Sequence, residues 1–96
     1  MKVSFLTPAQ QELDEAIAWY AAQAPGLGDS FLDEMRKTLT LVARHPLAWH
    51  KLSQQTRRCR LRRFPFSVVY CPTEDEVLVI AIAHQRRRPN YWRGRL

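Results

Sequence analysis

Long apolar runs are absent from this sequence, and glycine is scarce. No segment approaches the roughly 20 apolar residues that a membrane-spanning helix needs. The first six residues are followed at once by polar ones, so they lack the apolar core of a secretory signal. Only three glycines stand among 96 residues, which favours a defined fold with few flexible loops. We therefore expect a soluble, cytoplasmic protein that does not contact a membrane.

Cysteine is also scarce. The two cysteines, Cys59 and Cys71, are too few for a disulfide framework, and the three histidines are scattered. A zinc site needs about four ligands at close spacing, so we expect no metal and no cofactor. We expect both thiols to be reduced. A hairpin centred on Pro65 would place positions 59 and 71 opposite each other, where a cross-strand disulfide is conceivable.

The chain is too short for more than one ordinary domain. Its 96 residues are 46% hydrophobic and 10% aromatic, a composition typical of a globular protein rather than of a disordered one. Domains commonly hold about 100–150 residues. Residues 1–96 are therefore expected to form a single domain.

Acidic residues are concentrated in the first half of the chain. Residues 1–50 carry four basic and six acidic side chains, a net charge of −2, whereas residues 51–96 carry eleven basic and three acidic ones, a net charge of +8. Ten of those eleven bases are arginines, whose planar guanidinium groups suit bidentate contacts with phosphate or carboxylate. This half therefore indicates an anionic partner, either nucleic acid or an acidic protein segment. The alternative, a merely solvated surface, would mix lysine with glutamate.

The first half of the chain predicts a strand and then a helix. Residues 2–6 form the strand, after which Thr7 is expected to cap a helix that ends near Ala24, because Pro25 disfavours the helical conformation before it. The apolar stripe of that helix consists of Leu13, Ala16, Ile17 and Tyr20. The acidic side chains off this stripe are expected to face water or a partner; they are Glu12, Asp14 and Glu15.

A second helix follows the turn at residues 25–28 and is expected to reach about His45, where Pro46 ends it. Its apolar stripe consists of Phe31, Met35, Leu39 and Val42. Two amphipathic helices joined by so short a turn form an antiparallel hairpin. Their stripes cover each other only in part, so the hairpin must also lie on the second half of the chain.

The second half predicts an antiparallel meander of three strands, at residues 57–63, 67–71 and 77–83. Alternation in the first of them places Arg58, Arg60 and Arg62 on one basic face. The last strand is apolar at every position, which indicates burial of both its faces in the middle of the sheet. The predicted fold class is α+β: a short N-terminal strand, then an antiparallel helical hairpin packed on an antiparallel sheet, in the order β-α-α-β-β-β.

Several short motifs accompany this order of elements. They are Pro25-Gly26-Leu27-Gly28 ahead of Phe31, Pro46 with Trp49, Arg63-Phe64-Pro65-Phe66 leading to Val69-Tyr70, and Ala83-His84 followed by Arg88-Pro89-x-Tyr91-Trp92. In the order of these elements and motifs, from Val3 to Arg93, the sequence resembles the RelE/ParE superfamily of bacterial toxins. The resemblance implies the toxin of a type II toxin–antitoxin pair, of the kind linked to plasmid stabilisation. It also implies a hetero-oligomer in which a cognate antitoxin neutralises the toxin.

The superfamily contains two mechanisms. ParE-like members inhibit DNA gyrase, whereas RelE-like members cut messenger RNA on the ribosome. Metal-free RNA cleavage requires groups that move protons and groups that stabilise the charge of the phosphorane. In a nuclease, His84 and Tyr91 would carry protons here, and Arg62, Arg63 and Arg86 would stabilise charge.

The residues favour the ParE-like branch. No carboxylate lies between Glu34 and Glu74, so the general-base glutamate that some superfamily nucleases place between the second helix and the sheet has no counterpart. Only Lys51 occupies the region in which others carry a lysine cluster. We therefore hypothesise an inhibitor of gyrase rather than an enzyme. A ribosome-dependent mRNA endoribonuclease is one alternative, and an inactive antitoxin-binding relative is another.

Contacts with the antitoxin or the target are expected on the basic strand and in the C-terminal segment. A row of like charges on one strand is self-repelling unless an anionic partner neutralises it, and the family's antitoxins are typically acidic. The expected contact residues are Arg58, Arg60, Arg62, Arg86, Arg87, Arg88, Tyr91, Trp92 and Arg93. The alternative role for His84 is a hydrogen-bonded structural histidine. For Tyr91 and Trp92 it is packing that holds the C-terminal segment to the sheet edge.

Overall fold

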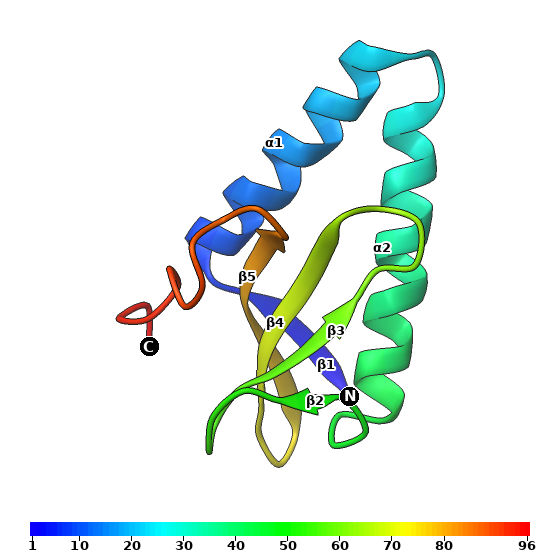
Figure 1. The fold of residues 1–96 in the computed structure, drawn as a ribbon. Coiled ribbons are helices and arrows are strands. Elements are labelled where there is room, and N and C mark those ends of the chain that lie inside the picture. Colours follow the sequence, from blue (N-terminus) through cyan, green and yellow to red (C-terminus); the bar gives the residue numbers. More distant parts are fainter.

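The computed structural model covers residues 1–96 and places two helices on a five-stranded sheet (Figure 1). In chain order the elements are β1 (Lys2–Phe5), α1 (Thr7–Gln23), α2 (Leu27–Arg44), β2 (His50–Lys51), β3 (Arg57–Arg60), β4 (Phe66–Pro72) and β5 (Glu76–His84). The strand order is β1-β5-β4-β3-β2, with β1 parallel to β5 and the other neighbours antiparallel. The predicted α+β class is confirmed, with β2 as an additional short edge strand. Neither helix has the length and apolar character needed to cross a membrane.

Proline marks both ends of α1, although not through the predicted cap. The capping residue is Leu6, and no side chain bonds to the free N–H groups of the first turn. The predicted cap at Thr7 is therefore wrong. Pro8 stands in this turn and has no N–H of its own, so one fewer donor needs a partner there. Both helices end two residues before a proline, within one residue of the predicted ends at Ala24 and His45.

The core lies between the helices and the facing side of the sheet. Phe31, Met35 and Val42 from the predicted stripe of α2 are completely buried in it. Four aromatic rings meet in this core, and those in contact have centroids 4.9 to 6.2 Å apart; they are Tyr20, Phe31, Phe64 and Phe66. Such pairs contribute about 0.5–1.5 kcal/mol each beyond their burial. The β3–β4 turn is therefore fastened to both helices.

β5 is buried on both faces, as its continuous apolar sequence predicts. Its pairing with β4 shifts by one residue at a bulge. Val69 pairs with Ala81, but the next residue, Tyr70, pairs with Val79. Ile80 is therefore the extra, unpaired residue of the bulge. The bulge distributes large side chains between the two faces. The helix side holds Val77, Val79 and Ile82, and the other side holds Ile80, Ala81 and Ala83.

The β3–β4 hairpin turns earlier than predicted. Cys59 pairs with Val68, so the pairing is centred before Pro65 rather than on it, and β3 ends three residues short of the predicted strand. Cys59 packs in the core on the helix side, whereas Cys71 packs on the opposite face of the sheet. A cross-strand disulfide between them is therefore excluded, and both are free thiols.

Gly28 lies where α2 begins to pack on α1. A Cβ atom at this position would meet Ala21 Cβ at 2.9 Å and Ile17 O at 3.0 Å. We therefore expect Gly28→Val to push the helices apart and to lower the free energy of unfolding by about 1–3 kcal/mol. Urea unfolding followed by tryptophan fluorescence measures the change. Ser30→Ala, which removes only an exposed hydrogen bond on the same turn, serves as control. An unchanged midpoint for Gly28→Val contradicts this account.

Candidate functional site: an arginine-lined groove

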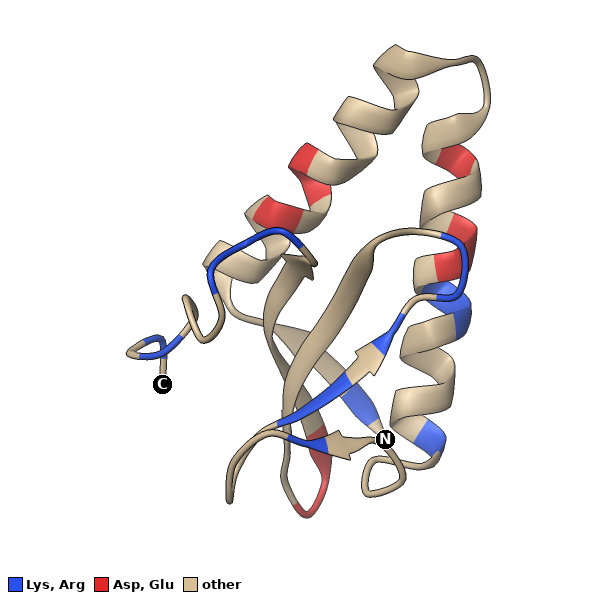
Figure 2. Cartoon of the chain, viewed as in Figure 1, with Lys and Arg blue, Asp and Glu red and all other residues tan.

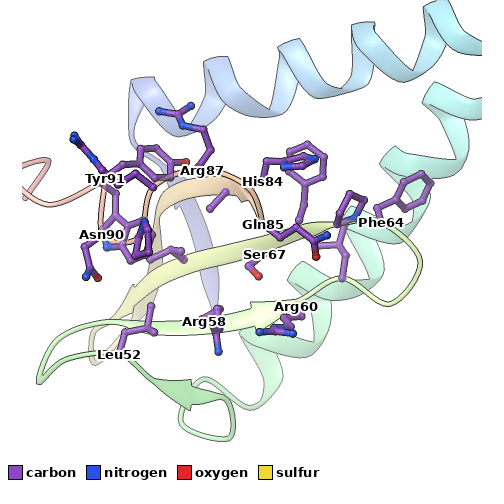
Figure 3. Close-up of a pocket in the computed structure, with 18 of the residues that line it drawn as sticks. Leu52, Arg58, Arg60, Phe64, Ser67, His84, Gln85, Arg87, Asn90 and Tyr91 are labelled. Carbon is purple, nitrogen blue, oxygen red and sulfur yellow. The ribbon is translucent and has the colours of Figure 1, made fainter.

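A groove of about 690 Å³ lies on the face of the sheet away from the helices, between the β3–β4 hairpin and the C-terminal segment, residues 85–96 (Figure 3). Its floor includes Ser67, Val69 and Ala83. Six arginines and no acidic residue line it; these are Arg58, Arg60, Arg62, Arg63, Arg87 and Arg88. We call this feature the arginine groove. Its lining suits an anionic ligand that also has an apolar surface.

Most of the basic residues lie on a different part of the molecule from the acidic ones, although α2 carries both signs. Figure 2 shows the acidic residues on α1, α2 and the β4–β5 turn, and basic residues along β3, the β3–β4 hairpin and the C-terminal segment. The formal net charge of the chain is +6. Such a separation attracts an anionic partner toward the basic side and raises its local concentration there.

β3 directs two arginines into the groove because the side chains of a strand alternate. Arg58 and Arg60 project on the groove side (Figure 3), and the residue between them is buried against the helices. Arg57 projects the other way, and its Nη1 donates hydrogen bonds to the backbone oxygens of Leu47, at 3.1 Å, and Trp49, at 2.9 Å. Arg57 is therefore a structural arginine that holds the loop between α2 and β2.

Glu34 of α2 holds the hairpin that forms one wall of the groove. Glu34 is only 7% exposed, and its carboxylate accepts hydrogen bonds from the backbone N–H and the Nε of Arg63, both at 2.8 Å. Burial by itself raises the pKa of this carboxyl, but the bonds from Arg63 and the backbone of Arg62 outweigh burial, and the pKa lies below its usual value. Arg63 is therefore engaged within the protein. No carboxylate pairs with Arg58, Arg60 or Arg62.

Glu12 of α1 holds the other wall, and the expectation that it faces water or a partner is wrong. Its Oε1 accepts from the backbone N–H of Ile82 at 3.1 Å and from Arg95 Nη1 at 3.0 Å. Its Oε2 accepts from the hydroxyl of Tyr91 at 2.8 Å and from Arg95 Nη2 at 3.0 Å. Burial raises the pKa of Glu12, but these bonds outweigh it and the pKa lies below its usual value.

Sequence reasoning missed the Glu12–Arg95 pair altogether. The one available signal was the position of Glu12 four residues before Ala16, which is buried. Residues four apart are neighbours on a helix surface, so Glu12 lies at the margin of the apolar stripe rather than on the open side of α1. Nothing in the sequence pointed from that margin to Arg95.

The two candidate proton carriers are held by other groups. Nδ1 of His84 accepts the backbone N–H of Arg86 at 3.0 Å, and its ring packs edge-to-face on Phe66 with centroids 5.0 Å apart. A neutral ring in this arrangement carries its proton on Nε2, so it offers a donor and no free base. The Tyr91 hydroxyl donates to Glu12, and burial together with this bond raises the pKa of Tyr91 far above its usual value. Neither group is arranged to accept a proton from a substrate.

The groove brings together most of the predicted contact residues. Its lining includes His84 and the predicted contacts Arg58, Arg60, Arg62, Arg87, Arg88, Tyr91 and Trp92. Arg86 and Arg93 are exposed and lie outside it. Tyr91 and Trp92 also pack on the apolar cluster of this side of the sheet. The C-terminal segment therefore covers part of the sheet's face as well as meeting its edge.

Comparison with known proteins identifies the family. A model of the ParE toxin of the type II toxin–antitoxin system parDE matches residues 3–89. The chain belongs to the ParE toxin family. It is similar to Toxin ParE2 of Mycobacterium tuberculosis, strains CDC 1551 and H37Rv, with 29% identity over 85 residues that cover 84% of this chain and 78% of the relative. The predicted resemblance to the ParE-like branch of the superfamily is thus confirmed.

A solved structure has the same fold. The chromosomal ParDE TA system from P. aeruginosa contains a chain that superimposes with a TM-score of 0.74 at 17% sequence identity, covering 88% of this chain and 95% of that one. The ParE architecture is therefore shared although few residues are. At this identity the fold alone is comparable, and the site must be argued from the residues of this chain.

The carboxylates of Glu12 and Glu34 make folding sensitive to acid. An unperturbed glutamate has a pKa near 4.5, and in the folded protein the pKa of both Glu12 and Glu34 lies below this value. The stability that they contribute is therefore complete above that value and is lost as the pH falls through the folded-state pKa. At neutral pH we expect Glu34→Gln to lower the free energy of unfolding by about 1–3 kcal/mol and to weaken the acid dependence.

Urea unfolding between about pH 3 and pH 7 measures this dependence. The exposed Glu15→Gln, on α1, makes the same chemical change and is expected to follow the wild type. A Glu34→Gln variant whose stability declines as steeply in acid as that of the wild type contradicts the role given to Glu34.

Proposed function

We propose that this ParE-family toxin inhibits DNA gyrase, and that a cognate antitoxin neutralises it by placing an acidic segment in the arginine groove. The observation that carries the antitoxin assignment is the groove itself, which is lined by six arginines and no acidic residue and whose floor includes the apolar Val69 and Ala83. The solved relative is described as a ParDE toxin–antitoxin system, which supports a protein partner for the basic side of this chain.

The groove specifies the chemistry of the antitoxin segment. Guanidinium groups form bidentate hydrogen bonds with carboxylates, so Arg58 and Arg60 would pair with acidic side chains that lie along β3. The small floor residues Val69 and Ala83 leave room for an apolar side chain of the segment. A chain that is disordered when free can cover such a surface by folding on it. An extended acidic segment with an apolar anchor fits these requirements.

Gyrase inhibition is a binding activity and needs no proton transfer. The engagement of His84 by a backbone N–H and of Tyr91 by Glu12 therefore supports it over RNA cleavage. Arg86 and Arg93 are exposed outside the groove, but they adjoin Arg87 and Trp92, which line it, so an antitoxin segment bound in the groove would obstruct a target that contacts them. We assign these two arginines to contact with gyrase.

Reversing charge on the groove side of β3 tests the antitoxin assignment. We expect Arg58→Glu with Arg60→Glu to weaken antitoxin binding by roughly 100- to 10,000-fold, since two charged hydrogen bonds are lost and each costs about 1.5–3 kcal/mol. Isothermal titration calorimetry with the purified antitoxin measures the affinity. Lys37→Glu with Arg44→Glu, two exposed positions of α2, introduces the same charge away from the groove. Equal affinities of the two double variants for the antitoxin contradict the proposal.

The target is tested by following thymidine and methionine incorporation in cells within minutes of expressing the toxin without antitoxin. We expect thymidine incorporation to collapse first, and the purified toxin to inhibit supercoiling by gyrase in vitro. Arg86→Glu with Arg93→Glu is expected to abolish both effects while antitoxin binding persists. An early collapse of methionine incorporation, with cleavage of mRNA on ribosomes, would overturn the gyrase assignment in favour of a RelE-like nuclease.

A further inference from the structure

The sheet has an edge that no strand covers, and α1 and the C-terminal segment meet there. β1 pairs with β5 only as far as Val79, whose backbone oxygen accepts the N–H of Leu6. Beyond this point the edge of β5 presents the backbone oxygen of Ile80 and the N–H of Ile82. Arg95 Nη1 donates to the first at 2.9 Å, and Glu12 Oε1 accepts from the second at 3.1 Å. The side chains of Glu12 and Arg95 thus bond the backbone groups of β5 that lie beyond the end of β1.

A single carboxylate joins three parts of the chain at this edge. Glu12 stands on α1, and its two oxygens bond β5 through Ile82 and the C-terminal segment through Tyr91 and Arg95. The side chains of Glu12 and Arg95 are only 14% and 19% exposed. Charge-assisted hydrogen bonds that are shielded from water are stronger than those between neutral groups. This contact therefore attaches the C-terminal segment by shielded charged hydrogen bonds, in addition to the packing of Tyr91 and Trp92 on the sheet.

The surrounding charges make the attachment depend on Glu12 itself. Two guanidinium groups lie over the ring of Tyr91, that of Arg87 at 3.9 Å and that of Arg95 at 5.1 Å. Arg87 Nη1 is also 4.0 Å from Glu12 Oε2. Without the carboxylate, two like charges would share one ring with no counter-ion between them, and they would repel each other. No other acidic side chain pairs with either arginine.

We propose that Glu12 is a positioning residue, which fixes the C-terminal segment as the second wall of the arginine groove. Arg87, Arg88, Tyr91 and Trp92 line that wall, and Glu12 sets their distance from Arg58 and Arg60 without lining the groove itself. Glu34 does the same for the opposite wall through Arg63. The part of this inference that concerns ligand binding rests on the proposed function, whereas the part that concerns the position of the segment does not.

The position of the segment is tested on the isolated toxin by NMR relaxation of backbone amides. In the wild type we expect order parameters of about 0.85 for residues 90–95, the value of a rigid backbone. In Glu12→Gln we expect these to fall below about 0.6 while β3 and β4 stay rigid. The matched control is Glu15→Gln, an exposed carboxylate of the same helix. Unchanged order of residues 90–95 in Glu12→Gln overturns the proposal.

A second variant removes the contact from the other side, in case α1 does not tolerate Glu12→Gln. Arg95→Met deletes both bonds to Glu12 and the bond to Ile80 while leaving α1 unaltered. It is expected to mobilise residues 90–95 in the same way. A rigid segment in the folded Arg95→Met variant equally overturns the proposal.

The consequence for the groove is measured with a synthetic hexaglutamate peptide as the probe. We expect Glu12→Gln to bind it about tenfold more weakly than the wild type and Glu15→Gln to bind it equally, because only the former displaces Arg87 and Arg88. Equal affinity of Glu12→Gln and the wild type overturns the role of Glu12 in the groove. Failure of the wild type to bind any acidic peptide overturns the proposed function instead, and the relaxation experiment still decides whether Glu12 positions the segment.

Discussion

Electrostatic repulsion within the second half of the chain is the constraint on which the rest of the structure depends. Residues 51–96 carry a net charge of +8, and an arginine-rich segment of this kind does not close on itself unaided. The two helices supply the counter-ions: Glu34 of α2 receives the β3–β4 hairpin, and Glu12 of α1 receives the C-terminal segment. The fold thus gives a carboxylate partner to the arginines that hold its walls, whereas four arginines of the groove have none; these are Arg58, Arg60, Arg62 and Arg88.

The sequence predicted what depends on local pattern. The stripes of α1 and α2, the helix ends before Pro25 and Pro46, and the doubly buried β5 all follow from spacing over a few residues. The Glu12–Arg95 contact joins residues 83 positions apart, and no periodicity reaches that far. The hairpin was misplaced for a related reason: Phe64 and Phe66 pack on Tyr20 and Phe31, and this tertiary contact, rather than Pro65, determines where the chain turns.

The bulge in β5 connects the core to the site. Because Ile80 is inserted opposite β4, the strand offers large side chains to the helices and also an apolar surface to the other face. Tyr91 and Trp92 pack on that second surface. In this position the hydroxyl of Tyr91 donates its hydrogen bond to Glu12 and is not directed toward a ligand in the groove.

The Glu12–Arg95 contact also limits how early the folded groove can form while the chain is being synthesised. Arg95 lies 83 positions after its partner in the first helix and beyond every strand of the sheet, so this bond cannot form until the whole sheet has been synthesised. β1 likewise waits for β5, the last strand to be made. A nascent chain therefore exposes its helices and hairpin well before it possesses a finished groove. A product whose synthesis stopped before Arg95 would contain all the helices and strands and would still lack the Arg95 bonds that join the C-terminal segment to α1 and β5.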